Sequence, residues 1–293
     1  MANLKEIRTR ISSVNSTMQI TSAMKMVSAS KLKRAQDAIT DMRPYAEKLQ
    51  EILGNLSESL DTSDGVYSVQ REANTVLLVA ITSNRGLCGG FNSNIVKECQ
   101  RLIKEEYASS KVHVLTIGKK AKDLLKSKGI PTNEGELPSD LEKVWDSVNF
   151  ETVAPVAQMI MDEFVAKNYD KVIVVYNKFK NAAVQEVVPE QMLPVLPPDE
   201  VESSSAANDY IFEPNKEEIV EDLIPKSLKI QLYKSVLDSH ASEHGARMTA
   251  MHKATDNAGE LKRELTLHYN KARQAAITNE ILEIVGGAEA LKS

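Results

Sequence analysis

The chain has 293 residues, 42% of them hydrophobic and 26% charged, a composition typical of a globular protein with one or two domains. Its longest apolar stretches, 76–81 and 172–176, are far shorter than the roughly 20 residues that span a bilayer, so direct membrane insertion is not expected. A net charge of −5 and two cysteines without metal-binding spacing argue against a nucleic-acid-binding protein, a disulfide scaffold and a zinc knuckle.

The first predicted element is a long helix within residues 1–60. Neither Gly nor Pro occurs between Ala2 and Arg43, and apolar residues recur at steps of three and four, which is the seam of a coiled coil. We expect Pro44 to kink this helix rather than end it. The expected seam consists of Leu4, Ile7, Ile11, Val14 and Met18, continued less regularly by Val27, Leu32, Ala35 and Ile39.

Charge is distributed unevenly along the chain. Residues 1–34 carry seven basic side chains against one acid, a net +6, whereas residues 190–225 carry ten acids against one lysine, a net −9. Such a split suggests that the basic end meets an acidic partner. The exposed cations of this end are expected to include Lys25, Lys31, Lys33 and Arg34.

A small α/β domain is predicted over residues 73–200. Three apolar segments read as buried strands, and helical patterns lie between them, which favours a doubly wound, Rossmann-like sheet. The predicted strands are 75–82, 111–118 and 170–177, and the predicted helices are 93–107, 119–128 and 151–167.

The glycine-rich loop SNRGLCGGFN (83–92) follows the first strand and raises the question of phosphate binding. It lacks the lysine of a P-loop and the GxGxxG spacing of a dinucleotide site. We therefore expect Gly86, Gly89 and Gly90 to form a tight structural turn, with Asn92 capping the next helix. A nucleotide-dependent α/β enzyme remains the alternative, and no cofactor is expected.

A second long helix is predicted within residues 210–293, starting after Pro214. Its small and apolar seam predicts close packing against another helix, and Gly245 and Gly259 would each cost about 1 kcal/mol without such packing. The economical solution is an antiparallel coiled coil of the two terminal helices, with a homodimeric coiled-coil scaffold as the alternative. The expected seam is Met251, Ala254, Ala258, Leu261, Leu265, His268, Ala272 and Ala275.

Two further features of this helix bear on function. His240, His244 and His252 have helical spacing, but the metalloprotease motif is absent, so surface histidines are expected rather than a metal site. The last segment, 277–293, stays apolar almost to its end, where chain termini are usually polar. It predicts a tip seated in a socket of another protein.

Five segments together are similar to the gamma subunits of F-type ATP synthases. The last of them resembles that family's carboxyl-terminal signature, ITxExxExxxGA. The segments are KEIRTRISSVNSTMQITSAMKMVSASKL (5–32), SNRGLCGGFN (83–92), VQEVVPEQMLPV (184–195), ASEHGARMTAMHKATDNA (241–258) and ITNEILEIVGGAEA (277–290). The resemblance implies a rotor shaft that couples rotation of a membrane ring, driven by ion flow, to the conformational cycle of catalytic beta subunits.

By the same resemblance the chain itself is not catalytic. The implied partners are the alpha and beta subunits, the epsilon subunit and the ring of c subunits, at the cytoplasmic face of a bacterial plasma membrane. Met24 and Lys25 should lie near an acidic lever of beta. The implied torque contacts are Arg247, Gln274, Thr278, Glu280 and Glu283, and the implied apical bearing is Ile284, Val285, Ala288 and Leu291.

Overall fold

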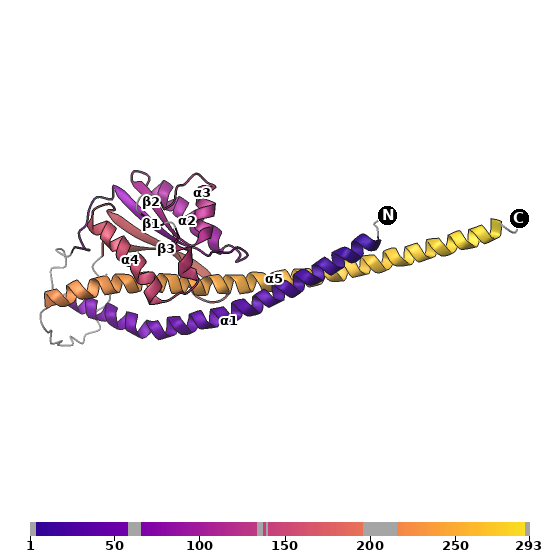
Figure 1. Cartoon of the computed structure of the whole chain (residues 1–293), viewed down its shortest axis with the longest axis horizontal. Coiled ribbons are helices and arrows are strands. Elements are labelled where there is room, and N and C mark those ends of the chain that lie inside the picture. Colours follow the sequence, from indigo (N-terminus) through magenta and orange to yellow (C-terminus); the bar gives the residue numbers. More distant parts are fainter. Residues whose placement is uncertain (1–3, 58–65, 134–136, 139, 196–215, 291–293) are drawn as a thin grey trace. The chain divides into compact units, whose positions relative to one another are not determined.

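The computed structural model of the chain describes residues 4–57, 66–133, 137–138, 140–195 and 216–290. It comprises two compact units, one of Met1–Ser28 with Met248–Ser293 and the other of Ala29–Arg247. Both units contain parts of two long helices, α1 (Leu4–Ser57) and α5 (Lys216–Ala290) (Figure 1). The two predicted terminal helices are thus confirmed, although 58–60 and 210–215 lie outside the described residues.

The unit of residues 29–247 is built on a four-stranded mixed sheet. Its strands are β1 (Thr75–Ile81), β2 (Lys111–Ile117), β3 (Lys171–Phe179) and β4 (Gln185–Leu193), in the order β2-β1-β3-β4. Strand β1 is parallel to β2 and β3, and β4 is antiparallel to β3. The first three strands were predicted, but β4 was missed. Pro189 interrupts its pattern, and an edge strand tolerates proline because one side of its backbone is not paired.

Helices cover both faces of this sheet. Helices α2 (Phe91–Arg101) and α3 (Lys119–Lys126) pack on one face, and α4 (Phe150–Val165) packs on the other (Figure 1). Alternate residues of β1 serve the two cores, because successive side chains of a strand point to opposite faces. The doubly wound α/β fold is therefore confirmed. A π-helical turn (Leu102–Glu106) follows α2, and a 3₁₀ turn (Leu141–Trp145) precedes α4.

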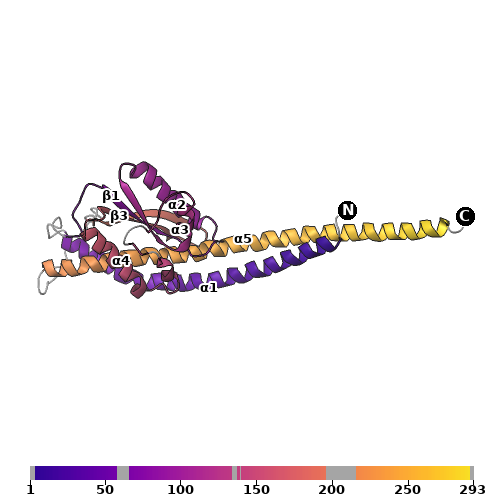
Figure 2. The same cartoon turned by 45° about the horizontal axis from the view of Figure 1, so that its top comes forward.

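The first half of α5 belongs to the same core as α4. Leu228, Leu232 and Val236 are buried with Ile160 and Phe164 against the sheet. This stretch was expected to lie in a coiled coil, and its contact with the strands was not predicted. Figure 2 shows α5 running beside α4 beneath the strands. This packing brings polar side chains of α5 to the ends of β1 and β3.

In the other unit, residues 4–28 of α1 lie antiparallel to the second half of α5 (Figures 1 and 2). The register is given by two hydrogen bonds. Lys262 Nζ donates to Asn15 Oδ1 at 2.7 Å, and Thr255 Oγ1 donates to Thr21 Oγ1 at 2.8 Å. Residue numbers rise along α1 as they fall along α5, so the predicted antiparallel pairing within one chain is confirmed.

In the turns of α1 that follow Met18, the buried positions are occupied by Thr21 and Ser28 rather than by Val27. Val27 is 58% exposed, whereas Thr21 and Ser28 are buried. Their hydroxyls donate to the carbonyls of Met18 and Met24, at 3.1 and 2.8 Å, and so cost little to bury. The expectation that Val27 lies in the seam was wrong because only apolar residues were counted.

The seam of α5 likewise differs at two predicted positions. Leu261 and His268 are exposed, and the half-buried Lys262 and Tyr269 take their places. Lysine suits such a position because its aliphatic stem packs while its ammonium reaches Asn15. Ala275 is exposed as well, whereas the other predicted seam positions are buried or half-buried: Met251, Ala254, Ala258, Leu265 and Ala272.

Candidate functional site

The glycine-rich loop after β1 is organised by Asn92. The Asn92 Oδ1 atom accepts from the Ser83 amide at 3.0 Å, and its Nδ2 donates to Ser83 Oγ at 2.9 Å. Asn92 therefore closes the loop instead of capping α2, whose N-cap is Gly90 without a side-chain hydrogen bond. The expected capping role was wrong. Gly89, with φ of 59°, supplies the left-handed turn that glycine accepts most readily.

Two features of the loop speak against a reactive or phosphate-binding site. Burial raises the pKa of the Cys88 thiol, which keeps it protonated and unreactive. The Asn92 Nδ2 also donates to Cys88 Sγ at 3.2 Å, so the polar groups inside the loop bond one another. The tip outside them exposes Leu87, which is 66% accessible and has a φ of 64°.

Arg247 of α5 binds the loop from the other side. Its Nη1 donates to the carbonyl of Gly86, and its Nη2 donates to the carbonyl of Arg85 at 3.2 Å. The same guanidinium forms a buried ion pair with Glu243 at 2.6 Å. Burial raises the pKa of the Glu243 carboxyl, and Arg247 opposes that rise, so the carboxylate depends on its arginine for staying charged.

The carboxyl end of β3 is also occupied by α5. The amide of Asn177 donates to Ser239 Oγ at 3.2 Å, and Ser242 Oγ donates to the Asn177 carbonyl at 3.0 Å. In open α/β sheets, ligands bind at the carboxyl ends of the strands where the strand order reverses, here between β1 and β3. Side chains of the chain's own helix fill this position.

His240 and His244 face the inside of the molecule, contrary to the expectation of surface histidines. Their Nε2 atoms are 3.1 Å apart, and His244 is buried. Burial lowers their pKa values to about 4 and about 3, with Lys31 adding to the effect at both, so both rings are neutral at pH 7. His252 is exposed beside Asp256, as predicted. The described residues hold no group of three or more metal-ligating side chains.

The hydrogen bond between the two histidines indicates their tautomers. His244 Nδ1 has no partner among the described residues. An unpartnered buried acceptor is tolerated more easily than an unpartnered buried N–H. We therefore infer that His244 donates through its Nε2–H to His240 and that its Nδ1 carries no proton.

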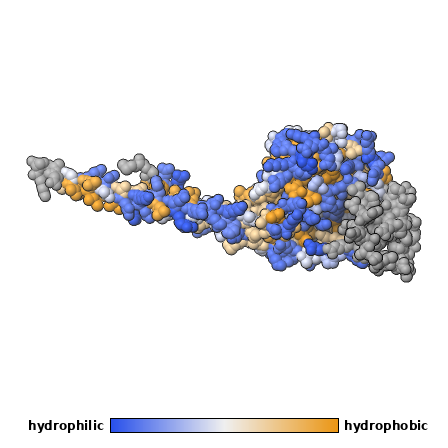
Figure 3. All heavy atoms as spheres, turned by 180° about the vertical axis from the view of Figure 1, so that it is seen from behind, coloured by the Kyte–Doolittle hydropathy of each residue, from blue (hydrophilic) through white to orange (hydrophobic). Residues whose placement is uncertain are grey.

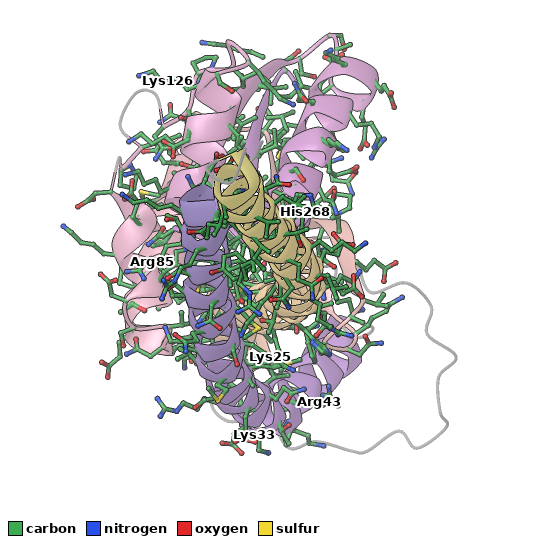
Figure 4. The ribbon with its side chains drawn as sticks, turned by 90° about the vertical axis from the view of Figure 1, so that its right-hand side faces the viewer. Lys25, Lys33, Arg43, Arg85, Lys126 and His268 are labelled. Carbon is green, nitrogen blue, oxygen red and sulfur yellow. The ribbon has the colours of Figure 1, made fainter. Side chains whose placement is uncertain are left out.

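The residues expected to meet partners through α1 differ in exposure. Met24 and Lys25 are half-buried, whereas Lys31, Lys33 and Arg34 are exposed. Lys33 lies on the outside of α1 (Figure 4) and forms a surface ion pair with Asp37 at 2.8 Å. An exposed pair of this kind contributes little to folding, so these cations are available to an external acidic group.

The last turns of α5 run beyond the first turn of α1 in the same unit (Figures 1 and 2). The register of the pair places Leu4 opposite about residue 273. All described side chains of α5 beyond Arg273 are exposed, among them Gln274, Thr278, Glu280, Glu283 and, in the expected bearing, Ile284, Val285 and Ala288. Leu291 lies outside the described residues. Apolar residues gather along this end in Figure 3.

Comparisons with known proteins bear on these surfaces. A family model described as ATP synthase matches residues 3–291. The chain is 63% identical, over the full length of both proteins, to the ATP synthase gamma chain of Flavobacterium psychrophilum. The chain belongs to the ATP synthase gamma chain family. It is also 45% identical, again over the full length of both, to the gamma chain of Geotalea daltonii.

Chains with a similar fold occur in solved structures of ATP synthases. A chain in the cryo-EM structure of the central stalk and c-ring of the Tetrahymena thermophila mitochondrial ATP synthase is 28% identical and has a TM-score of 0.57. The match covers 80% of this chain and 99% of that one. A chain from the Euglena gracilis mitochondrial ATP synthase is 21% identical, with a TM-score of 0.65 over 98% of this chain and 94% of that one, and shows the fold alone.

The helices of this gamma-family chain, where described, include none long and apolar enough to cross a membrane. Three residues that join α5 to the carboxyl end of β3 were not predicted: Asn177, Ser239 and Ser242. The two serines give little signal in the sequence, because small residues at helical spacing are also typical of a helix that simply packs against another helix. Arg247 was singled out by resemblance, but its bonds to the loop carbonyls were not foreseen.

Proposed function

We propose that this gamma-family chain is the rotating central shaft of a bacterial ATP synthase. It would couple ion-driven rotation of a membrane ring of c subunits to the conformational cycle of the catalytic beta subunits, and it would not itself be catalytic. Family membership and the likeness to a central-stalk structure support this proposal. The observation that carries it is the uncovered apolar end of α5.

The end of α5 has the properties of an axle tip. Ile281, Leu282 and Ile284 are 54%, 62% and 66% exposed, and α1 does not extend far enough to cover them. Exposed apolar surface of this kind marks a contact with another protein. A socket formed by the alpha and beta subunits would cover it, and apolar contacts are non-directional, so the tip could turn without breaking specific bonds.

Torque would pass through contacts below the tip, most of them charged or polar. The proposed contacts to beta are Met24, Lys25, Lys31, Lys33 and Arg34 on α1, and Gln274, Thr278, Glu280 and Glu283 on α5. A shaft can bias three sites differently only if it interacts differently with each of them, so an uneven surface is required. Arg247 is buried, and we assign it the role of holding the loop after β1 rather than of touching beta.

The remaining partners follow from the rotor model. The epsilon subunit and the c-ring would bind the end opposite the tip, on the cytoplasmic side of the plasma membrane. A nucleotide-dependent enzyme is the less favoured alternative, because side chains of α5 occupy the position where a doubly wound sheet binds its ligand. Family membership also disfavours a homodimeric scaffold.

Co-expression with the candidate alpha and beta subunits tests this function. The tagged chain should copurify with a complex that hydrolyses ATP, and membranes carrying the whole enzyme should pump ions on ATP addition. Isolation of the chain as a stable homodimer, or nucleotide turnover by the chain alone, would contradict the proposal.

A charge-reversal variant tests the basic contacts. Replacing Lys31, Lys33 and Arg34 with Glu should lower the ions pumped per ATP hydrolysed, with a loss that shrinks at high salt because screening weakens charge contacts. A matched control replaces three exposed lysines of another face, Lys97, Lys104 and Lys126, with Glu. Lys126 projects from α3 into solvent (Figure 4). An equal loss of ions pumped per ATP in both variants would contradict the assignment of these cations to a charge contact with beta.

A further inference from the structure

The stretch of α5 from Gln231 to Arg247 is attached to the α/β domain at four places. At one end, Gln231 Nε2 donates to Glu190 Oε1 at 2.7 Å and to the Gln191 carbonyl at 3.2 Å. At the other end, Arg247 binds the carbonyls of Arg85 and Gly86. The two ends are about 24 Å apart along the helix.

The two places between them also involve backbone. Ser239 accepts a hydrogen bond from the Asn177 amide, and Ser242 donates one to the Asn177 carbonyl. A Cβ added to Gly245 would lie 3.1 Å from the Cα and 3.2 Å from the carbonyl oxygen of Ala182. Such a distance is tighter than ordinary contact, so the two backbones touch where glycine allows it.

These contacts fix the axial position of the helix as well as its packing. A helix held by apolar contacts alone can shift along its neighbour, because such contacts are non-directional. Hydrogen bonds to backbone atoms have narrow distance and angle limits, and a buried polar group without its partner is costly. A shift of one residue, about 1.5 Å, would break the contacts at Asn177 and at both ends.

We propose that these four contacts form a register lock, which makes the α/β domain and residues 231–247 of α5 turn as one rigid piece with no sliding of the helix along the sheet. The inference rests on the proposed rotor function and adds to it the residues that transmit torque inside the chain. Asn177, Ser239, Ser242 and Gly245 are positioning residues in this scheme, because they act through α5 and not on a partner.

A covalent crosslink tests whether the register changes during turnover. Gln231→Cys and Glu190→Cys place two thiols where the side chains already meet, and a short cleavable reagent joins them in the assembled enzyme. Cys88 and Cys99 are buried, and the wild-type chain treated with the same reagent controls for them. ATP hydrolysis and ion pumping should be unchanged by the crosslink. Loss of pumping that returns on cleavage would overturn the proposal.

Loosening the lock tests its role in torque. Ser239→Ala with Ser242→Ala should speed hydrogen exchange of the Asn177 amide and lower the ions pumped per ATP hydrolysed at least twofold, while hydrolysis continues. Ser242→Thr alone keeps both hydroxyls. This variant should therefore pump as many ions per ATP as the wild-type chain. An unchanged ratio in a complex whose Asn177 amide exchanges faster would overturn the proposal. Failure of the untreated wild-type chain to assemble would instead count against the rotor function itself.

Discussion

The two halves of α5 are held by different kinds of contact. The first half is buried against the sheet, bonded to backbone atoms and joined to the loop after β1 by the ion-paired Arg247. The second half meets α1 through small, half-buried residues and side-chain hydrogen bonds such as that from Lys262 to Asn15. One helix thus provides a fixed base and a surface left open to partners.

Removing Arg247 should have the largest effect on folding. Arg247→Leu leaves the Glu243 carboxylate buried without its cation, which typically costs about 3–5 kcal/mol. Urea unfolding followed by the fluorescence of Trp145, the chain's one tryptophan, reports on this unit. Lys262→Leu is the control in the other unit, followed by the circular dichroism of its helices, and should cost about 1 kcal/mol, because its partner Asn15 is neutral and can turn to water.

A second change separates loss of the ion pair from loss of packing. Adding Glu243→Gln to Arg247→Leu removes the uncompensated charge and should recover part of the lost free energy of unfolding. No recovery would mean that the loop bonds, rather than the ion pair, account for the effect. Equal costs for the Arg247 and Lys262 variants would contradict the difference between the two halves.

Gly245 and Gly259, both within α5, should respond to substitution in opposite directions. Gly245→Val places a branched side chain against the backbone of Ala182 and should destabilise the chain by about 1–3 kcal/mol. Gly259→Ala meets only the sulfur of Met18 at 4.0 Å and should stabilise by about 1 kcal/mol through helix propensity. Hydrogen exchange of amides near each site gives the sign. Stabilisation by Gly245→Val would show that α5 is not pressed on the sheet.

Acid should destabilise the packing of the first half of α5 through His240 and His244. The folded pKa values of His240 and His244, about 4 and about 3, lie below the unfolded value of 6.5. Above pH 6.5 the two rings do not lower the free energy of unfolding. As the pH falls from 6.5 toward the folded pKa values, the free energy of unfolding drops by up to about 1.4 kcal/mol per pH unit for each ring. Asp238, whose pKa burial raises to about 6, acts in the opposite sense.

Substituting the pair isolates its contribution. His240→Gln with His244→Gln should flatten the loss of unfolding free energy between pH 6 and pH 4, whereas His252→Gln, at an exposed site, should leave the profile unchanged. The His240 ring lies 5.6 Å from Trp145, so its protonation should also quench the fluorescence of the folded chain. Identical profiles for the two variants would refute the assignment.

The sequence predicted regular features well and polar packing poorly. Strands β1 to β3 and both long helices followed from apolar periodicity, because burial on two faces or along one stripe leaves a clear pattern. The positions of Thr21, Lys262 and the histidine pair did not, because these polar residues are buried or half-buried against partners distant in sequence, such as Trp145 beside His240. Asn92 was misassigned as a helix cap because its partner, Ser83, precedes the turn.

The smallest effect on folding is expected at the tip of α5. Leu282→Ala removes a side chain that is 62% exposed and should change the free energy of unfolding by less than about 0.5 kcal/mol. The same variant should weaken assembly with the alpha and beta subunits if the tip sits in an apolar socket. A folding cost comparable to that of a buried leucine would show that the tip packs within the chain.

The rotor account is tested most directly by watching this chain turn. A bead attached through Lys126→Cys, an exposed site on α3, reports the orientation of the α/β domain in an immobilised complex with alpha and beta subunits. Addition of ATP should drive stepwise rotation of the bead in one direction. A bead that stays still while the complex hydrolyses ATP at its full rate would contradict the account.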